Sequence, residues 1–473
     1  MDDWLGNSSS VVKAFESKAS TRAQPRVGGT FRKSGASHQG PIIRRLEILK
    51  QHPFFPSSIF LLRKVTNNLF FSQSNYCLTC INFMSTTHEI VILGAHHGGV
   101  NTAHYLLRHI IPPLSRLTPT VSYHITIVSP NTDFYWNVAA PRHLACEQLI
   151  PASSIWFSIA SAFERYDKKL IKFINGKATD LNPGTRTVFI TTGSNQTQDV
   201  TYSTLVIATG SSYASPIWQI NESDAVTKAE ISRIRDSLMS ARTILISGGG
   251  AVGVETAGEI ASRYPSKNVT LLSGTTRLLI RLTACNSATA ESKLKKLGVR
   301  TLHNLRVWTA TKNEDGTTTL GFSDGSNRVV DVFIDATGPR PNTTFLPPSW
   351  IDPRGHVIVE PLTLRSKISG VYAVGDVANY CDGGIISTAN GVAPVCTSIG
   401  IDLAKAAGKT SPFEQKMYKG IGETQFVPTG PSGGVGQIMG WWIPSWTVWL
   451  IKSRSFFLRM AKSAVDGGDH VKP

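Results

Sequence analysis

The chain has 473 residues, of which 41% are hydrophobic and 17% charged, and its formal net charge is +16. This length exceeds one ordinary core, so we expect two or three domains of ordinary globular composition. The charge suits anionic partners such as nucleotides or acidic lipid surfaces, whereas nucleic acid is disfavoured because no zinc-finger or RNA-binding motif accompanies it. No apolar run approaches the roughly 20 residues that span a bilayer. We therefore expect a cytoplasmic protein, soluble or peripheral on a membrane.

Residues 1–83 differ from the rest in composition. They begin rich in Ser, Gly, Gln and Pro, with scattered Lys and Arg and few acids, which predicts a disordered basic extension. A mitochondrial targeting sequence is the alternative, but Asp2 and Asp3 fit it badly. The folded part is expected to begin near Met84. Cys77 and Cys80 form a lone CxxC with no second pair to complete a zinc site, so no metal is expected.

The first recognisable unit is an apolar strand, a glycine-rich turn, a helix and a second strand between residues 89 and 128. This order predicts a parallel βαβ unit. The turn resembles GxGxxG, which binds a dinucleotide diphosphate at the helix N-terminus, but His96 replaces the middle glycine and requires a looser approach. The second strand ends in Ser129 rather than in an acid that would hold the ribose. The expected cofactor contacts of this unit are Gly94, His96, Gly98, Gly99 and Ser129.

A second unit of the same kind lies at residues 243–272 and carries a complete GxGxxG turn. Its expected cofactor contacts are Gly248, Gly250, Gly253 and Glu255. No acid ends its second strand, so nothing there repels the 2′-phosphate of NADPH. Arg277 either binds that phosphate or is a solvated surface charge. We therefore expect NADH or NADPH at this unit and leave the preference open.

Three further segments follow in a fixed order. Residues 204–210 and 332–338 are apolar strands that each end in Ala-Thr-Gly, and residues 370–376 end in Gly-Asp. This set resembles the flavoprotein disulfide reductase superfamily with two dinucleotide folds. The resemblance spans about residues 88–440 and implies that FAD occupies the first unit, that Asp376 takes the FAD ribitol, and that the Ala-Thr-Gly turns cross between domains. The residues concerned are Ala208, Thr209, Gly210, Thr337, Gly338, Gly375 and Asp376.

A helix is expected to begin at Pro394, because proline suits the first turn of a helix, and to run through Lys405. In the superfamily this helix points its positive end at the flavin, where it stabilises the charge of the reduced ring. Ala393 is therefore an expected cofactor contact.

Neither nucleotide unit holds the close cysteine pair of a disulfide reductase, although Cys146 leaves a single-thiol mechanism as an alternative. Residues 129–142 and 427–437 resemble the apoptosis-inducing-factor-2-like family, which includes the ferroptosis suppressor enzyme. That resemblance implies oxidation of NAD(P)H through FAD, with a quinone or similar small molecule as acceptor. Arg142 is expected near the flavin or its phosphates, with an ordinary ion pair as the alternative.

Residues 440–459 are rich in Trp and Phe, with Lys and Arg close behind. Such a segment either lies in a membrane interface or completes the core of a C-terminal domain, and we favour the core.

The expected fold class is α/β, with two Rossmann-like domains, the second inserted in the first, and a small C-terminal domain. FAD is expected in residues 84–215 and 341–410, NAD(P)H in residues 216–340, and the aromatic-rich region in residues 411–473. The expected activity is hydride transfer from NAD(P)H to flavin and on to a quinone or similar small electron acceptor. No catalytic side chain is assigned. The alternative is a cofactor-bound redox-sensing or death-signalling protein whose turnover is incidental.

Overall fold

The computed structural model describes residues 86–473 apart from residues 195, 221–222 and 471. The predicted disordered extension over residues 1–83, with Cys77, Cys80 and the start at Met84, lies outside the described residues.

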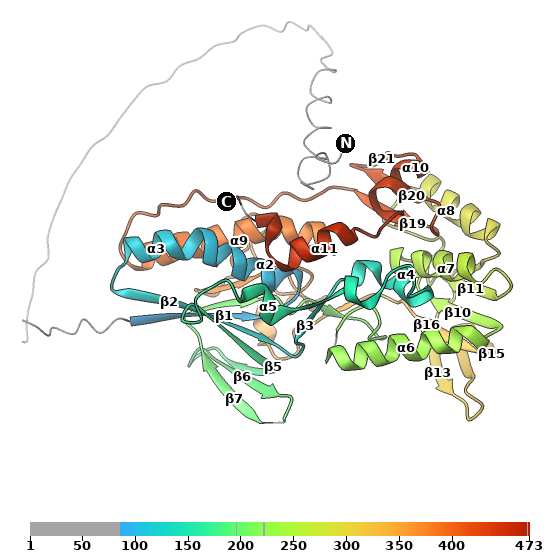
Figure 1. Ribbon diagram of the computed structural model, residues 1–473, viewed down its shortest axis with the longest axis horizontal. Helices are drawn as coiled ribbons and strands as arrows, with labels where there is room; N and C mark the ends of the chain where they lie inside the picture. The colour runs from blue at the N-terminus through green and yellow to red at the C-terminus, as the bar shows by residue number, and fades with distance from the viewer. Residues whose placement is uncertain (1–85, 195, 221–222, 471) are drawn as a thin grey trace, which may run out of the picture. The chain divides into compact units, whose positions relative to one another are not determined.

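A seven-stranded sheet with the strand order β18-β8-β1-β2-β5-β6-β7 forms the first nucleotide unit (Figure 1). Its centre is parallel and buried, which explains the nearly continuous apolar runs of its strands. β5 begins parallel to β2 and continues as an antiparallel extension with β6 and β7. The strands are β1 (Thr86–Leu93), β2 (Val121–Ser129), β5 (Ile171–Asn182), β6 (Thr187–Thr192), β7 (Thr197–Thr201), β8 (Thr204–Ile207) and β18 (Val371–Ala373).

Helices α2, α3 and α9 pack together on one face of this sheet, and α11 packs against α2 (Figure 1). β3 and β4 form a short antiparallel pair; β3 leads towards α4 and β4 into α5. Both β3 and α5 contact α2, since Phe134 lies 4.8 Å from the His97 ring and Phe163 stacks on His104 at 4.4 Å. The bounds are α2 (His97–Tyr105), α3 (Ile111–Leu117), β3 (Asp133–Tyr135), α4 (Ala140–Ala145), β4 (Trp156–Ser158), α5 (Ile159–Phe163), α9 (Ile385–Ala406) and α11 (Leu458–Val465).

A four-stranded parallel sheet with the order β12-β11-β10-β16 forms the second unit. An antiparallel sheet of β13, β14 and β15 adjoins it, and β9 pairs with β17 where the chain returns to β18 of the first sheet. The bounds are β9 (Ser211–Ser212), α6 (Asp224–Ser240), β10 (Thr243–Ser247), α7 (Ala251–Arg263), β11 (Asn268–Leu272), α8 (Ala284–Lys296), β12 (Arg300–Leu302), β13 (Val307–Lys312), β14 (Thr318–Phe322), β15 (Asn327–Val330), β16 (Val332–Asp335) and β17 (Arg340–Pro341). The predicted α/β class with two Rossmann-like units is confirmed.

The start of α9 differs from the prediction. The helix begins at Ile385, directly after Gly384 with its φ of +100°, and Pro394 lies in its interior. A proline inside a helix lacks the N–H that would bond to the carbonyl four residues earlier, here that of Asn390. The helix tolerates this loss because it is long and largely buried. Ala393 consequently lies in the middle of α9 and not at its N-terminus.

The C-terminal region forms a small sheet of β19 (Gln425–Pro428), β20 (Gly434–Ile438) and β21 (Trp441–Trp442), followed by α10 (Ser445–Val448). The expectation that its aromatic residues complete a core is wrong for its tryptophans. Trp441, Trp442 and Trp446 are 80%, 58% and 67% exposed, whereas Phe456 is fully buried. The exposed tryptophans precede the buried Phe456 in the chain. The aromatic-rich segment therefore contributes side chains both to the surface and to the core.

The end of α11 is held against α2 and against the π-helical turn Leu106–Ile110 that follows α2. His104 Nε2 donates to the carbonyl of Val465 at 2.9 Å, and Arg108 Nη2 donates to that of Asp466 at 2.7 Å. These bonds satisfy carbonyl groups that the end of α11 leaves without helical partners. They fix the C-terminal segment to the first nucleotide unit.

Candidate active site

A cavity of about 450 Å³ lies where the first glycine turn, the start of α7, the start of α9 and the C-terminal segment meet. Such a volume suits a cofactor or small-molecule site. Many of the residues predicted from the sequence line it: Gly94, His96, Gly98, Ser129, Ala208, Thr209, Gly210, Glu255, Gly375 and Asp376.

The first glycine turn is too tight for side chains at its two ends. Gly94 has a φ of +106°, and a Cβ there would lie 2.3 Å from the carbonyl oxygen of Ala208. A Cβ on Gly99 would lie 1.8 Å from the carbonyl oxygen of Gly94. The turn therefore brings β1, β8 and α2 into direct backbone contact. The first N–H groups of α2, which have no helical partner, are the natural diphosphate donors at this point.

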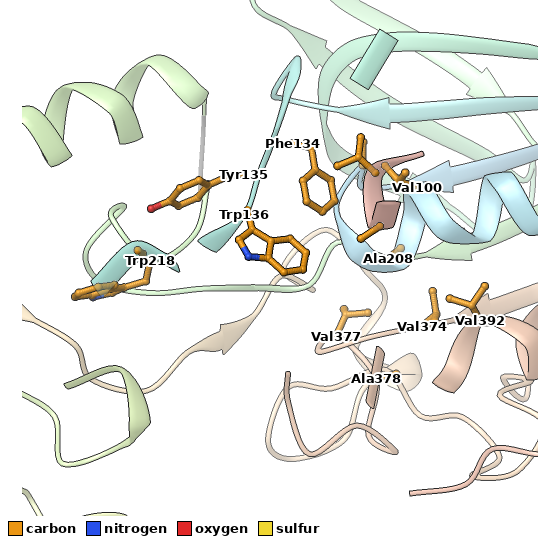
Figure 2. Close-up of a cluster of buried hydrophobic side chains, with 14 of the residues drawn as sticks. Val100, Phe134, Tyr135, Trp136, Ala208, Trp218, Val374, Val377, Ala378 and Val392 are labelled. Atoms are coloured by element: carbon orange, nitrogen blue, oxygen red, sulfur yellow. The ribbon is translucent and has the colours of Figure 1, made fainter. Parts of the chain in front are cut away.

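His96 is anchored to β3. Its Nε2 lies 2.6 Å from the carbonyl oxygen of Tyr135, to which it donates, and its ring stacks on Phe134 at 4.5 Å. Figure 2 shows the Phe134 ring beside Val100 of α2, while Tyr135 points away from it. At the matching position of the second turn, a Cβ on Gly250 would meet nothing within 4 Å. A side chain at the middle position, such as that of His96, is thus compatible with the geometry of these glycine turns.

Both histidines of the first turn are neutral at physiological pH. Burial lowers the pKa of His96 to about 4, although its bond to Tyr135 opposes the shift. Burial also lowers the pKa of His97 well below its usual value, and the neighbouring His96 adds to this effect. An anion bound at this turn must therefore be held by backbone N–H groups and the helix dipole rather than by an imidazolium.

Asp376 follows β18 at the cavity wall. Its Oδ1 accepts bonds from the Gly384 amide at 3.2 Å and from the Cys381 thiol at 3.5 Å, which ties it to the start of α9. Burial raises the pKa of Asp376. Burial and the nearby carboxylate together raise the pKa of the Cys381 thiol to about 12, so this thiol is not a nucleophile at neutral pH.

The start of α9 faces the same cavity, which Gly383, Gly384 and Ile385 line. The predicted contact at Ala393 is not among the lining residues, because the helix begins earlier than expected. The first turn of α9 takes the place that the sequence assigned to Ala393.

Glu255 and Lys452 form a buried ion pair at the cavity wall. Lys452 Nζ lies 2.6 Å from Glu255 Oε1, and the two side chains are 14% and 3% exposed. Burial raises the pKa of Glu255, while the Lys452 ammonium lowers it. Glu255 follows from the sequence, but Lys452 was missed. Its signal is a lysine within an aromatic segment that has no acid of its own.

Arg142 does not line the cavity, and it forms the ion pair that was the alternative to a place near the flavin or its phosphates. Its guanidinium forms two hydrogen bonds with Glu259, of 2.8 and 2.7 Å, and lies 4.6 Å from the centre of the Phe456 ring. Glu259 is one helical turn after Glu255. Successive carboxylates of α7 therefore bind cations from α4 and from the C-terminal segment.

The second glycine turn repeats the geometry of the first. Gly248 has a φ of +128°, and a Cβ there would lie 2.3 Å from the carbonyl oxygen of Ala336. A Cβ on Gly253 would lie 1.9 Å from the carbonyl oxygen of Gly248. This match at both ends of the turn fits a second dinucleotide, although these glycines and Gly250 do not line the 450 Å³ cavity. Ala251 at the start of α7 does line it.

Three other predicted contacts of the second unit also lie outside the cavity lining. The Thr337 hydroxyl and amide both donate to Asp335 Oδ1, at 2.6 and 2.9 Å, and a Cβ on Gly338 would meet nothing within 4 Å. The Arg277 guanidinium donates to three carbonyl groups of its own loop, those of Leu279, Ile280 and Leu282. The hydrogen-bond donors of Arg277 therefore stabilise its own loop.

Residues 88–409 match the family described as pyridine nucleotide-disulphide oxidoreductase. The chain belongs to this family. Oxidoreductase phnG of Penicillium herquei is 33% identical over 79% of this chain and 95% of its own length. Ferroptosis suppressor protein 1 of Taeniopygia guttata is 26% identical over 78% of this chain and 94% of its own. The solved water-forming NADH oxidase of Lactobacillus brevis aligns with a TM-score of 0.55 at 18% identity, covering 72% of this chain and 73% of that one.

Family membership confirms the resemblance drawn from the ordered motifs. This pyridine nucleotide-disulphide oxidoreductase is an FAD-dependent enzyme that uses NADH or NADPH. The cradles that only glycine fits, at Gly94 and Gly248, are consistent with one dinucleotide at each unit.

Proposed function

We propose that this oxidoreductase passes electrons from NADH or NADPH through FAD to a quinone or a similar small acceptor. The observation that carries the proposal is the lining of the cavity between the two units: among the described residues, no cysteine contributes to it. Apolar side chains such as Ile220, Phe426 and Phe457 contribute instead. A flat, apolar acceptor suits this wall better than a disulfide substrate does.

FAD, when bound, accepts hydride from the nicotinamide and delivers electrons to the acceptor. The chain supplies binding and electrostatics. The first turns of α2 and α9 present free N–H groups and the positive ends of their dipoles to the cavity. Lys452 is fixed by Glu255 and keeps N–H donors for a polar atom of whatever binds beside it.

The thiol alternative finds little support in the geometry. Cys146 is buried, and its Sγ donates to Gln148 Oε1 at 3.2 Å. Neither Cys146 nor Cys381 lines the cavity. Serine variants of both cysteines should therefore keep full quinone reductase activity, whereas a thiol mechanism requires at least one of them to abolish it.

The test of the proposed function is a spectral titration of the purified protein. The visible flavin bands should bleach on anaerobic addition of NADH or NADPH and recover promptly with a short-chain ubiquinone. Slow recovery with tight retention of the reduced flavin would instead favour the redox-sensing or death-signalling alternative. A protein that neither retains nor takes up FAD would refute both the oxidoreductase proposal and the redox-sensing alternative.

A further inference from the structure

The C-terminal region carries an exposed apolar surface, which we call the tryptophan patch: Met439, Trp441, Trp442, Trp446, Trp449 and Leu450. Single exposed apolar residues are common on soluble proteins, but a group of neighbouring indoles marks an interaction surface. The patch covers β21, α10 and the turn after it, which lie together at one end of the C-terminal sheet (Figure 1).

The scaffold beneath the patch is well fixed. Met439 and Gly440, with φ of +50° and +82°, form the tight turn between β20 and β21, which is the geometry that antiparallel hairpins favour. Ser445 Oγ accepts from the Gly434 amide and from Lys293 Nζ, both at 3.1 Å, and so holds α10 to the sheet and to α8. The indoles are therefore displayed by an ordered hairpin and helix.

The segment that carries the patch contains basic side chains and no acidic ones. No Asp or Glu occurs from Thr424 to Val465, whereas Arg454 and Arg459 are exposed and form no ion pair among the described residues. The Arg454 guanidinium lies 5.8 Å from the centre of the Trp449 ring. One carboxylate lies close to the patch, that of Glu423, whose Oε2 would be 3.4 Å from a Cβ on Gly440 at the hairpin turn. Exposed indoles with the unpaired Arg454 beside them match the interface of an anionic bilayer, where rings lie at headgroup depth and cations meet lipid phosphates.

We propose that the tryptophan patch docks the enzyme peripherally on an anionic phospholipid surface. No helix among residues 86–473, gaps excepted, is long and apolar enough to cross a membrane, so the contact would be interfacial. A second copy of the chain fits the patch less well, because both copies carry a formal net charge of +16 and the exposed Arg454 beside the patch. The docking itself does not depend on which acceptor the enzyme reduces.

The patch is structurally joined to the cavity. β21 pairs with β20, which pairs with β19, and Gln425 and Phe426 at the start of β19 line the cavity. If the proposed function holds, docking places this cavity wall near the bilayer, and the acceptor class becomes membrane-dissolved quinones.

The experiment is co-sedimentation of the full chain with phosphatidylcholine vesicles, with and without phosphatidylserine, in the absence of nucleotide and acceptor. The variant W441Q/W442Q/W446Q should lower partitioning at least about tenfold, because apolar burial is lost. The variant R454Q/R459Q should lower it by about fivefold per charge, and only on vesicles that contain phosphatidylserine. The matched control is W308Q, since Trp308 on β13 is 72% exposed and lies outside the patch; it should bind like the parent.

Two outcomes would overturn the proposal. One is equal partitioning of the parent and the triple tryptophan variant. The other is a concentration-dependent dimer in analytical ultracentrifugation that the same variant abolishes, which would assign the patch to a second copy. Reduction of a water-soluble quinone should be the same for the parent and the triple variant. If the proposed function is wrong, neither the parent nor the triple variant will reduce the quinone. If only the docking proposal is wrong, both proteins will reduce it but will partition equally onto vesicles.

Discussion

The buried pair of Arg142 and Glu259 makes the sharpest prediction about the fold. The two side chains are 7% and 3% exposed, and the guanidinium also donates to the carbonyl of Arg454 at 3.3 Å. Replacing Arg142 by Leu leaves the Glu259 carboxylate buried without a cation. Removal of one partner from such a pair costs about 3–5 kcal/mol. We therefore expect R142L and E259L each to lower the free energy of unfolding by several kcal/mol.

The double variant R142L/E259L should recover much of that loss, because apolar groups of similar size in place of both partners leave no unpaired charge. The measurement is chemical denaturation of the four proteins followed by tryptophan fluorescence, which gives the coupling energy of the pair. FAD content should change little while the fold persists. If R142L keeps the stability of the parent but loses FAD, Arg142 contacts the cofactor after all, and the structural argument is refuted.

Three further predictions concern the cofactor sites. G99A should abolish FAD retention, measured from the visible spectrum, because its Cβ would lie 1.8 Å from a backbone oxygen. K452M should lower the unfolding free energy by about 3 kcal/mol and reduce turnover, since Glu255 becomes a buried unpaired carboxylate; K452R, which keeps the charge, should retain most of both. R306A should raise the KM for NADPH about tenfold and leave the KM for NADH unchanged. The Arg306 side chain lies against Gly274 after β11, and its exposed guanidinium forms no ion pair among the described residues. It is therefore available for the 2′-phosphate, which only NADPH carries. R277A should affect both nucleotides alike, and the reverse result for these two arginines would contradict the assignment.

The glycine turns were predictable from the sequence because their constraint is local. Gly94 and Gly248 must adopt positive φ beside a neighbouring strand, and no other residue does so without strain. The ordered Ala-Thr-Gly and Gly-Asp segments were predictable for a related reason. Each follows a buried parallel strand, whose carboxyl end has to face the ligand crevice.

Arg142 and Lys452 were not predictable because their partners are distant in the sequence. Arg142 lies in the first unit, yet its partner Glu259 lies on α7 of the second. Lys452 pairs with Glu255 across 197 residues. An arginine in a motif and a lysine in an aromatic tail look alike in sequence whether they bind phosphate, a carboxylate or solvent. The start of α9 was predicted wrongly at Pro394, because proline is found more often in the first turn of a helix than in its interior.

The C-terminal segment around residues 446–457 contributes side chains both to the cavity and to the surface. Lys452 and Phe457 line the cavity, and the same stretch carries the exposed Trp446 only six residues before Lys452. Lys452 is held by Glu255, whose helix α7 begins at the second glycine turn. A displacement of the C-terminal segment would therefore unpair a buried carboxylate within two turns of the nicotinamide-nucleotide site. The tryptophan patch and the cavity are therefore joined through one short segment, from Trp446 to Lys452, which the buried ion pair fixes to α7.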